Sequence, residues 1–166
     1  MSAKRAGRLA LLTAAALIIF IVELRIPNLV RIPGIKLGLA NIVTVYAVYH
    51  CNHNETFLIV LSRIFLGAFF AGNFISVIYS LCGALLCLVG MFVFQHFIDE
   101  SLIWVSSVLG AVLHNMGQIA AAVIIMKTTA VISYLPFLIV SGCIAGAFTG
   151  VCAQILIKRV GLDKDW

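Results

Sequence analysis

Long apolar runs, separated by short polar or turn-forming stretches, dominate the pattern along the chain. A run of about 20 apolar residues lets an α-helix cross the hydrocarbon core of a bilayer with its backbone groups bonded internally. The pattern therefore predicts six transmembrane helices in a single transmembrane domain, residues 1–166. We expect them over Leu9–Leu24, Ile35–Tyr49, Thr56–Ala71, Ile75–Phe97, Leu102–Met126 and Ile132–Ile157.

Composition supports this fold class, an all-α integral membrane protein. Of the 166 residues, 63% are hydrophobic and 10% are charged, against about 25% charged residues in an average soluble domain. A disordered chain needs low hydrophobicity and a nucleic-acid-binding domain needs a clustered basic surface, so both classes are excluded. The lipid bilayer is the expected environment, and we expect a multi-pass protein of the cell (plasma) membrane.

Basic residues at the two ends of the chain predict its orientation. They are Lys4, Arg5 and Arg8 before the first apolar run, and Lys158, Arg159 and Lys164 after the last. Cytoplasmic flanks of membrane proteins are enriched in Lys and Arg. We therefore expect both termini in the cytoplasm, which requires an even number of crossings.

Arg25, Arg31 and Lys36 depart from that rule, because they lie in or beside the first connection, on the predicted outer side. Two explanations remain open. These cations would bind an anionic ligand, or their long side chains would reach lipid headgroups.

The fifth apolar run carries the richest group of polar side chains, His114, Asn115 and Gln118. Residues three and four apart share a helix face, and polar groups in a bilayer face the bundle interior because lipid contact is costly. We expect these side chains to bind a ligand with hydrogen-bonding groups; the alternative is a hydrogen-bonded clamp between helices. The same face carries little bulk, at Gly110, Ala111, Ala121 and Ala122.

Arg63 lies near the middle of the third run. A guanidinium does not neutralise by deprotonation, so it needs a carboxylate, a carbonyl, water or an anionic ligand as its partner. A structural ion pair with Glu23 and a role in binding an anion are both open.

The stretch from Arg31 to Asn41, RIPGIKLGLAN, places a Pro-Gly turn before an apolar helix. Unpaired N–H groups at a helix N-terminus favour an anion. Lys36 would add a positive charge, and Asn41 would supply a hydrogen-bonding group one turn further in. We therefore predict that Lys36 and Asn41 bind substrate.

Other chemistry is not indicated. The sequence contains no GxxxxGK[ST] loop, no paired acidic motif for Mg²⁺ and no recognisable nucleophile–base pair, so we expect a non-catalytic protein without a cofactor. The four residues His50 to His53 hold histidine and cysteine but have no carboxylate arranged around them, and we expect no metal site.

Small residues recur at helical spacing in two places. Ala6, Ala10 and Ala14 form a stripe on the first helix, which lets another helix approach closely, either within this bundle or from another protein. The segments 80–90 and 107–117 share Ser, Gly, Ala, Leu and Gly at the same offsets. We expect the fourth and fifth helices to pack through these small-residue faces.

Three stretches resemble one protein family. They are IPGIKLGLANI from Ile32, RIFLG from Arg63 and GAVLHNMGQ from Gly110. Over nearly its whole length, the chain resembles the family named Gx transporter or heptaprenyl diphosphate synthase component I. Its size and six-helix pattern are in turn similar to the substrate-binding (S) components of energy-coupling factor (ECF) transporters.

The resemblance to S components implies a six-helix bundle that captures a vitamin or precursor from outside the cell. It implies a transmembrane coupling protein and two cytoplasmic ATPases as partners. In that class a small-residue stripe on the first helix docks the coupling protein, and Ala6, Ala10 and Ala14 match it. Nickel and cobalt members carry His where this chain has Ser2, so a metal substrate is not expected.

The sequence is thus interpreted as the substrate-binding subunit of an ECF-type importer for a small vitamin- or precursor-like molecule. An anionic compound related to isoprenoids, quinones or flavins is a candidate substrate. Two other classes remain open. One is a non-catalytic membrane subunit associated with polyprenyl diphosphate synthesis, and the other is a purely structural membrane-assembly protein.

The predicted topology can be tested by cysteine labelling at positions 3 and 164, after the five native cysteines are replaced. We expect Ala3→Cys and Lys164→Cys to react with a membrane-impermeant maleimide only in permeabilised cells, because both flanks are basic. Labelling of either position in intact cells would contradict cytoplasmic termini.

Overall fold

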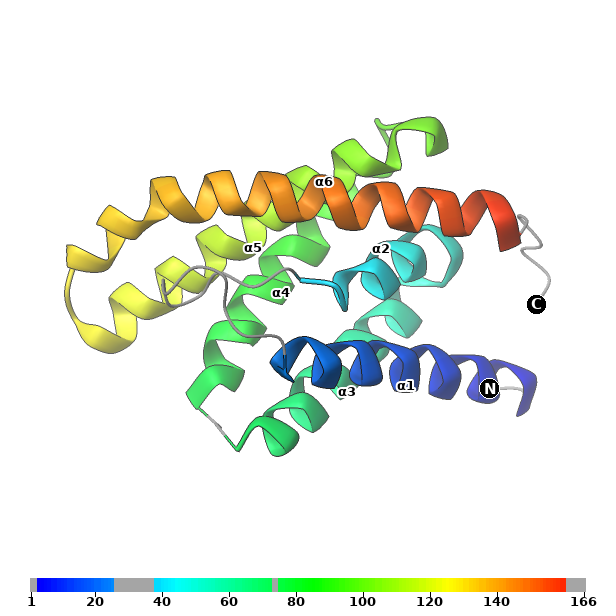
Figure 1. The fold of residues 1–166 in the computed structure, drawn as a ribbon, viewed down its shortest axis with the longest axis horizontal. Coiled ribbons are helices and arrows are strands. Elements are labelled where there is room, and N and C mark those ends of the chain that lie inside the picture. The colour runs from blue at the N-terminus through cyan, green and yellow to red at the C-terminus, as the bar shows by residue number, and fades with distance from the viewer. Residues whose placement is uncertain (1–2, 26–37, 73–74, 161–166) are drawn as a thin grey trace.

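The computed structural model describes residues 3–25, 38–72 and 75–160, and within these ranges the chain forms helices and turns without a strand. The predicted all-α fold class is therefore confirmed for the part of the chain that is described (Figure 1). The helices are α1 (Ala3–Arg25), α2 (Asn41–His50), α3 (His53–Ala71), α4 (Ile75–Phe94), η1 (Glu100–Leu102), α5 (Ile103–Met126), η2 (Ala130–Tyr134) and α6 (Leu135–Val160).

Five helical segments are long and apolar enough to cross a membrane, and they make the chain a multi-pass membrane protein. They comprise α1, α3, α4, α5 with η1, and α6 with η2. The other helix, α2, has 10 residues and spans about 15 Å, roughly half of a bilayer core. The predicted helix Ile35–Tyr49 is wrong over residues 38–40, which precede α2, and its residues 35–37 lie outside the described ranges.

A turn at Gly38 explains why α2 begins late. Gly38 has a φ of 68°, which suits glycine, and its carbonyl accepts the N–H of Asn41. The next bond, from the N–H of Ile42 to the carbonyl of Leu39, continues the turn into the helix. Asn41 is consequently the first residue of α2 and not a residue one turn inside it.

Glycines bring α4, α5 and α6 into backbone contact. A Cβ added at Gly117 of α5 would lie 2.6 Å from the carbonyl oxygen of Cys82 in α4. On the other side of α5, a Cβ at Gly146 or Gly150 of α6 would lie 2.8 Å from the Cα of Val108 and 2.6 Å from that of Trp104. The predicted packing of the fourth and fifth helices through small residues is confirmed, and α6 packs on α5 through glycines in the same way.

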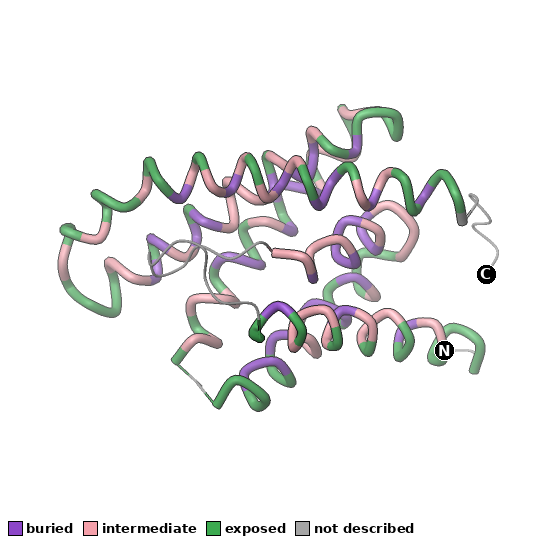
Figure 2. Tube along the Cα trace, in the orientation of Figure 1, coloured by how far each residue is buried: buried purple, intermediate pink, exposed green. Residues whose placement is uncertain are grey.

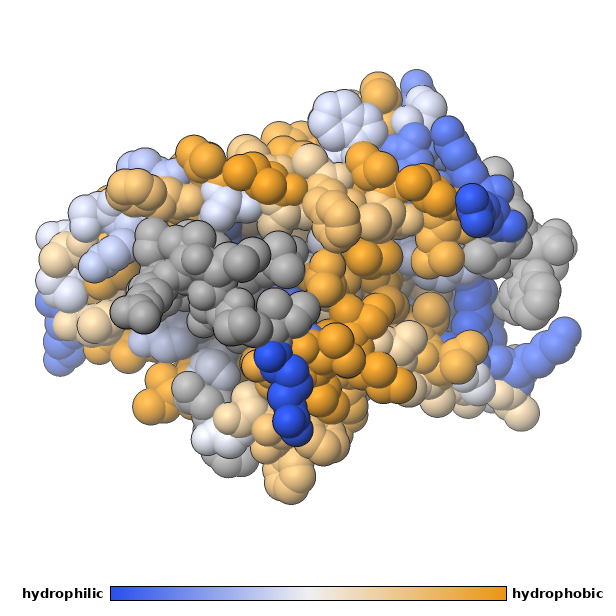
Figure 3. All heavy atoms as spheres, viewed as in Figure 1, coloured by the Kyte–Doolittle hydropathy of each residue, from blue (hydrophilic) through white to orange (hydrophobic). Residues whose placement is uncertain are grey.

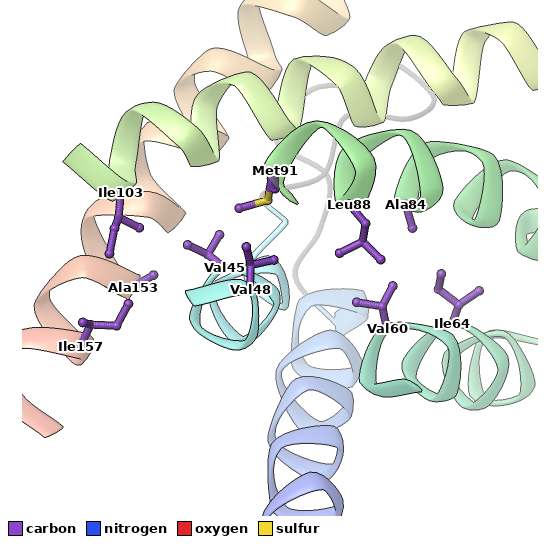
Figure 4. Close-up of a cluster of buried hydrophobic side chains, with 10 residues drawn as sticks. All are labelled: Val45, Val48, Val60, Ile64, Ala84, Leu88, Met91, Ile103, Ala153 and Ile157. Atoms are coloured by element: carbon purple, nitrogen blue, oxygen red, sulfur yellow. The ribbon is translucent and has the colours of Figure 1, made fainter. Parts of the chain in front are cut away.

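The short helix α2 lies at the centre of the core. Val45 and Val48 of α2 pack in one apolar cluster with side chains of α3, α4, α5 and α6 (Figure 4). Ala47, also in α2, packs with Leu9 of α1 and Ile59 of α3. Because α2 is packed on several sides, burial against its neighbours accounts for its stability, as expected for so short a helix.

The first turn of α1 and the last turn of α6 lie at the same end of the molecule, at the right of Figure 1, and the α5–α6 connection lies at the other end. Figure 2 shows that much of the outer surface of these long helices is exposed. Apolar side chains cover much of that surface between more hydrophilic ends (Figure 3). This is the distribution expected for a protein surrounded by lipid.

The glycine contacts predict a sharp difference between two Gly→Ala substitutions. Gly117→Ala should lower the melting temperature in detergent, because its Cβ meets α4 backbone and overpacking costs about 1–3 kcal/mol. Gly7→Ala in α1 has nothing within 4 Å of its Cβ and should not lower it, since alanine favours helix. Equal melting temperatures for the two variants would contradict the close α4–α5 contact.

Candidate functional site

A cavity of about 540 Å³ lies in the half of the bundle away from the chain termini. Its lining residues include Glu23 near the end of α1, Ser76 at the start of α4 and Met126 at the end of α5. All six α-helices contribute to it. The cavity therefore occupies the end of the bundle where α1 and α5 finish and α4 and α6 begin.

Five of the six residues predicted to bind substrate line this one cavity. They come from α2, α3 and α5 and are Asn41, Arg63, His114, Asn115 and Gln118. The sixth, Lys36, lies outside the described residues. The fold thus brings together side chains that are up to 77 positions apart in the sequence (118 − 41 = 77); their role in binding stays a prediction.

Arg63 is only partly satisfied by the protein. Its Nη1 donates to Oδ1 of Asn41, at 3.2 Å. A guanidinium has five N–H groups, and no other hydrogen bond joins Arg63 to the part of the chain that the structure describes. The remaining donors belong to a cavity-lining side chain and are available to a ligand or to water.

Glu23 bonds to backbone and does not form the ion pair considered for Arg63. Its Oε1 accepts the N–H of Gly38 at 2.6 Å, although the side chain is 8% exposed. This bond ties the end of α1 to the turn before α2. An ion pair between described residues joins Arg5 to Glu55 instead, with an N···O distance of 3.7 Å.

The three polar residues of α5 do not all face the same neighbour, so the expectation of a single shared face was too simple. His114 and Gln118 lie against α4, where an added Cβ at Gly83 would be 3.1 Å from His114 Cε1 and 2.9 Å from Gln118 Cγ. Asn115 faces α6 and donates from Nδ2 to the carbonyl of Leu138, at 2.6 Å. Consecutive helical residues are rotated by about 100°, which separates the two directions.

The hydrogen bond of Asn115 is also the interhelical clamp that the sequence left open as an alternative. It crosses from α5 to α6 at the cavity wall. Of the small residues expected to leave space, Ala111 and Ala122 line the cavity, whereas Gly110 packs on Met91 and Cys87 and Ala121 is buried. The clamp and an open cavity therefore exist side by side.

Sequence reasoning missed several polar and aromatic residues of the lining. Phe20, Tyr79, Ser76, Ser80 and Ser141 belong to it. Single serines and aromatic residues in apolar runs carry no distinctive pattern. Gly67, one turn after Arg63, is the sequence signal that could have been used, because a glycine beside a polar residue leaves room for a large neighbour. In the structure that neighbour is Phe20, whose ring would lie 2.9 Å from a Cβ at Gly67.

The histidine- and cysteine-containing turn lies between α2 and α3, outside the cavity lining. His50 stacks on Tyr46 with ring centroids 4.7 Å apart, and His53 packs on Phe92 at 4.2 Å. Burial raises the pKa of the Cys51 thiol, which makes it a poor nucleophile near neutral pH.

The alanine stripe of α1 is exposed at Ala6, Ala10 and Ala14. Another side of the helix, which carries Leu9 and Ala16, is the buried one. The bundle therefore does not use the stripe for its own packing, and the stripe faces lipid or another protein.

Comparison with known proteins gives one match. Residues 12–156 match the family described as heptaprenyl diphosphate synthase component I. No curated protein and no solved structure matches the chain.

The bond between Glu23 and Gly38 predicts a contrast between two substitutions of Glu23. Glu23→Leu removes the acceptor and leaves the N–H of half-buried Gly38 unpaired. This should lower the melting temperature, because an unpaired N–H costs up to about 1–3 kcal/mol when it is fully buried. Glu23→Gln keeps an acceptor oxygen and should melt close to the wild type. A Glu23→Gln variant as unstable as Glu23→Leu in detergent would contradict this role.

Proposed function

Because the chain belongs to the heptaprenyl diphosphate synthase component I family, we propose a function for it as a membrane protein of that family. It is the membrane-embedded, substrate-binding subunit of an importer of the energy-coupling factor type. Its substrate is a small vitamin- or precursor-like molecule. The observation that carries this proposal is the polar cavity inside the bundle.

The cavity supports ligand binding through both its size and its lining. At about 540 Å³ it falls within the range of about 300–1,000 Å³ that is usual for small-molecule sites. Arg63, His114 and Gln118 are costly inside a bilayer and line the cavity. A protein with a purely structural role gains nothing from such groups around open space.

Six crossings with cytoplasmic termini would suit this function. The first turn of α1 and the last turn of α6 lie at the same end of the molecule (Figure 1), and both carry exposed basic residues, among them Lys4 and Arg159. The positive-inside rule favours the cytoplasm for this end. The cavity then lies in the outer half of the membrane, where it captures a substrate from outside. In this topology α2 belongs to the second crossing in chain order, which brings the five long segments to six.

The exposed stripe of α1 is the proposed docking surface for a transmembrane coupling protein. Ala6, Ala10 and Ala14 lie in the part of α1 nearest to its cytoplasmic end. Small side chains let two helix backbones approach closely, and in lipid this packing supplies much of the association energy. Two partner ATPases in the cytoplasm would power transport, and this chain itself is non-catalytic.

The family description favours a second candidate, a non-catalytic membrane subunit associated with polyprenyl diphosphate synthesis. The two candidates differ in their partners. An importer subunit copurifies with a membrane coupling protein and ATPases, whereas the second candidate copurifies with a soluble prenyl synthase.

Pull-down and melting measurements on α1 variants test the proposal. We expect Ala10→Leu and Ala14→Leu to lose the coupling protein and ATPases in a pull-down from native membranes, because added bulk blocks helix contact. Their melting temperatures should stay close to the wild type, since both positions are exposed. The matched control is Ala16→Leu at a position with 0% exposure, which should lower the melting temperature.

Two results would count against the importer function. One is a wild-type pull-down that contains a prenyl synthase and no ATPase. The other is normal recovery of the ATPases by Ala10→Leu and Ala14→Leu, which would place the docking surface elsewhere.

A further inference from the structure

Asn115 is held in one orientation by its bond to α6. Its side chain lies 2.6 Å from the carbonyl oxygen of Leu138. A carbonyl oxygen only accepts hydrogen bonds, so the amide nitrogen must lie at this contact and the amide oxygen Oδ1 on the other branch. Gly142 permits the approach, because a Cβ there would lie 2.6 Å from Nδ2 of Asn115.

The Oδ1 atom of Asn115 is left as an open acceptor on the cavity wall. It accepts no hydrogen bond from the described part of the chain. The atom is also not fully enclosed by protein, since it is absent from the buried polar atoms that lack a partner. Asn115 lines the cavity, so Oδ1 is open to its contents. An N–H or O–H group of a ligand would satisfy it.

Arg63 offers the opposite chemistry from another helix. Its guanidinium can only donate, and one donor is used by Asn41. A carboxylate is a strong partner for the remaining N–H groups. Glu23 lines the same cavity with a negative charge, so a singly charged acid is favoured there over a multiply charged one.

Apolar and bifunctional groups complete the cavity. Phe20, Ile64 and Ile119 supply apolar lining, and Gln118 can both donate and accept. A compact apolar skeleton with polar groups at two places matches this lining better than a long unsubstituted chain.

On this basis, and resting on the proposed substrate-binding function, we propose that the cavity selects a small organic acid that also carries a separate hydroxyl or N–H donor. Arg63 binds the acid group. Asn115 is the specificity-determining residue, because its Oδ1 accepts the hydrogen bond of the ligand's donor. A fatty acid lacks the donor, and a diphosphate ester carries too much negative charge.

Matched probes can test the requirement for a donor. The probes are 3- and 4-hydroxybenzoate with their methyl isosteres, 3- and 4-methylbenzoate. Binding is measured by equilibrium dialysis of the full chain in detergent micelles, with micelles alone as the blank. We expect at least one hydroxybenzoate to bind the wild type roughly fivefold more tightly than its isostere, the gain from one net hydrogen bond.

Variants assign that preference to Asn115. Asn115→Ala should bind a hydroxybenzoate and its isostere equally, because Oδ1 is gone. Gly142→Ala, which displaces the amide without removing it, should also lose the preference and serves if Asn115→Ala does not fold. The control Thr149→Val removes another α5–α6 bond, between Ser107 and Thr149 at 3.2 Å, outside the cavity lining, and should keep the preference.

Arg63→Gln should weaken the binding of all four acids while leaving the preference for a hydroxyl group. Three results would overturn the inference: no binding of any probe, equal binding of isosteres by the wild type, or an unchanged preference in Asn115→Ala. The pull-down separates this inference from the proposed function. If the ATPases are recovered but the wild type shows no hydroxyl preference, only the selection by Asn115 is overturned and the importer function stands. If the preference is found but no ATPase is recovered, only the importer function is overturned.

Discussion

Close backbone contact between α4, α5 and α6 is the constraint on which the rest of the structure depends. Lipid is as apolar as the side chains, so burial gives helices in a bilayer little reason to associate, and van der Waals packing must replace it. Gly117 and Gly150 supply that packing, because added Cβ atoms would lie 2.6 Å from the neighbouring helices. The three helices consequently form a unit against which α2 and α3 pack, and α1 packs in turn on α2 and α3.

The same glycines position the polar groups of the cavity. Gly83 lies against His114 and Gln118, and Gly142 lies against Asn115. At each place the absent side chain of one helix makes room for a polar side chain of the next. Packing and site are thus two results of one pattern, in which small residues bring the helices together and polar residues follow where space remains.

Sequence patterns predicted the long helices and the membrane environment well, because both depend on composition and period alone. They also pointed to Asn41, Arg63 and the polar residues of α5, since polar groups in apolar runs must face inward. What they could not predict depends on neighbours from other helices. The late start of α2 follows from the turn at Gly38, and the partner of Glu23 is a backbone N–H 15 residues away.

The different directions of His114 and Asn115 were hidden for a similar reason. Spacing along one helix predicts only that the residues share a side. Which of them faces α4 and which faces α6 depends on where these two helices lie. Single serines in apolar runs give no periodic signal, so the hydroxyl groups of the lining could not be predicted either. Local sequence therefore identified the residues, and tertiary packing decided what each one faces.

Arg63 has a consequence for how the protein enters the membrane during synthesis. A charge at the centre of a helix costs about 2.5–3.5 kcal/mol on translocon scales, and α3, which carries Arg63, is the least hydropathic of the five spanning segments. The most hydropathic, α4, follows it after a short connection that starts with Gly72 in a left-handed conformation. Entry of α3 and α4 as a hairpin would let the second helix compensate for the first, and would shield the guanidinium from lipid before α5 is made.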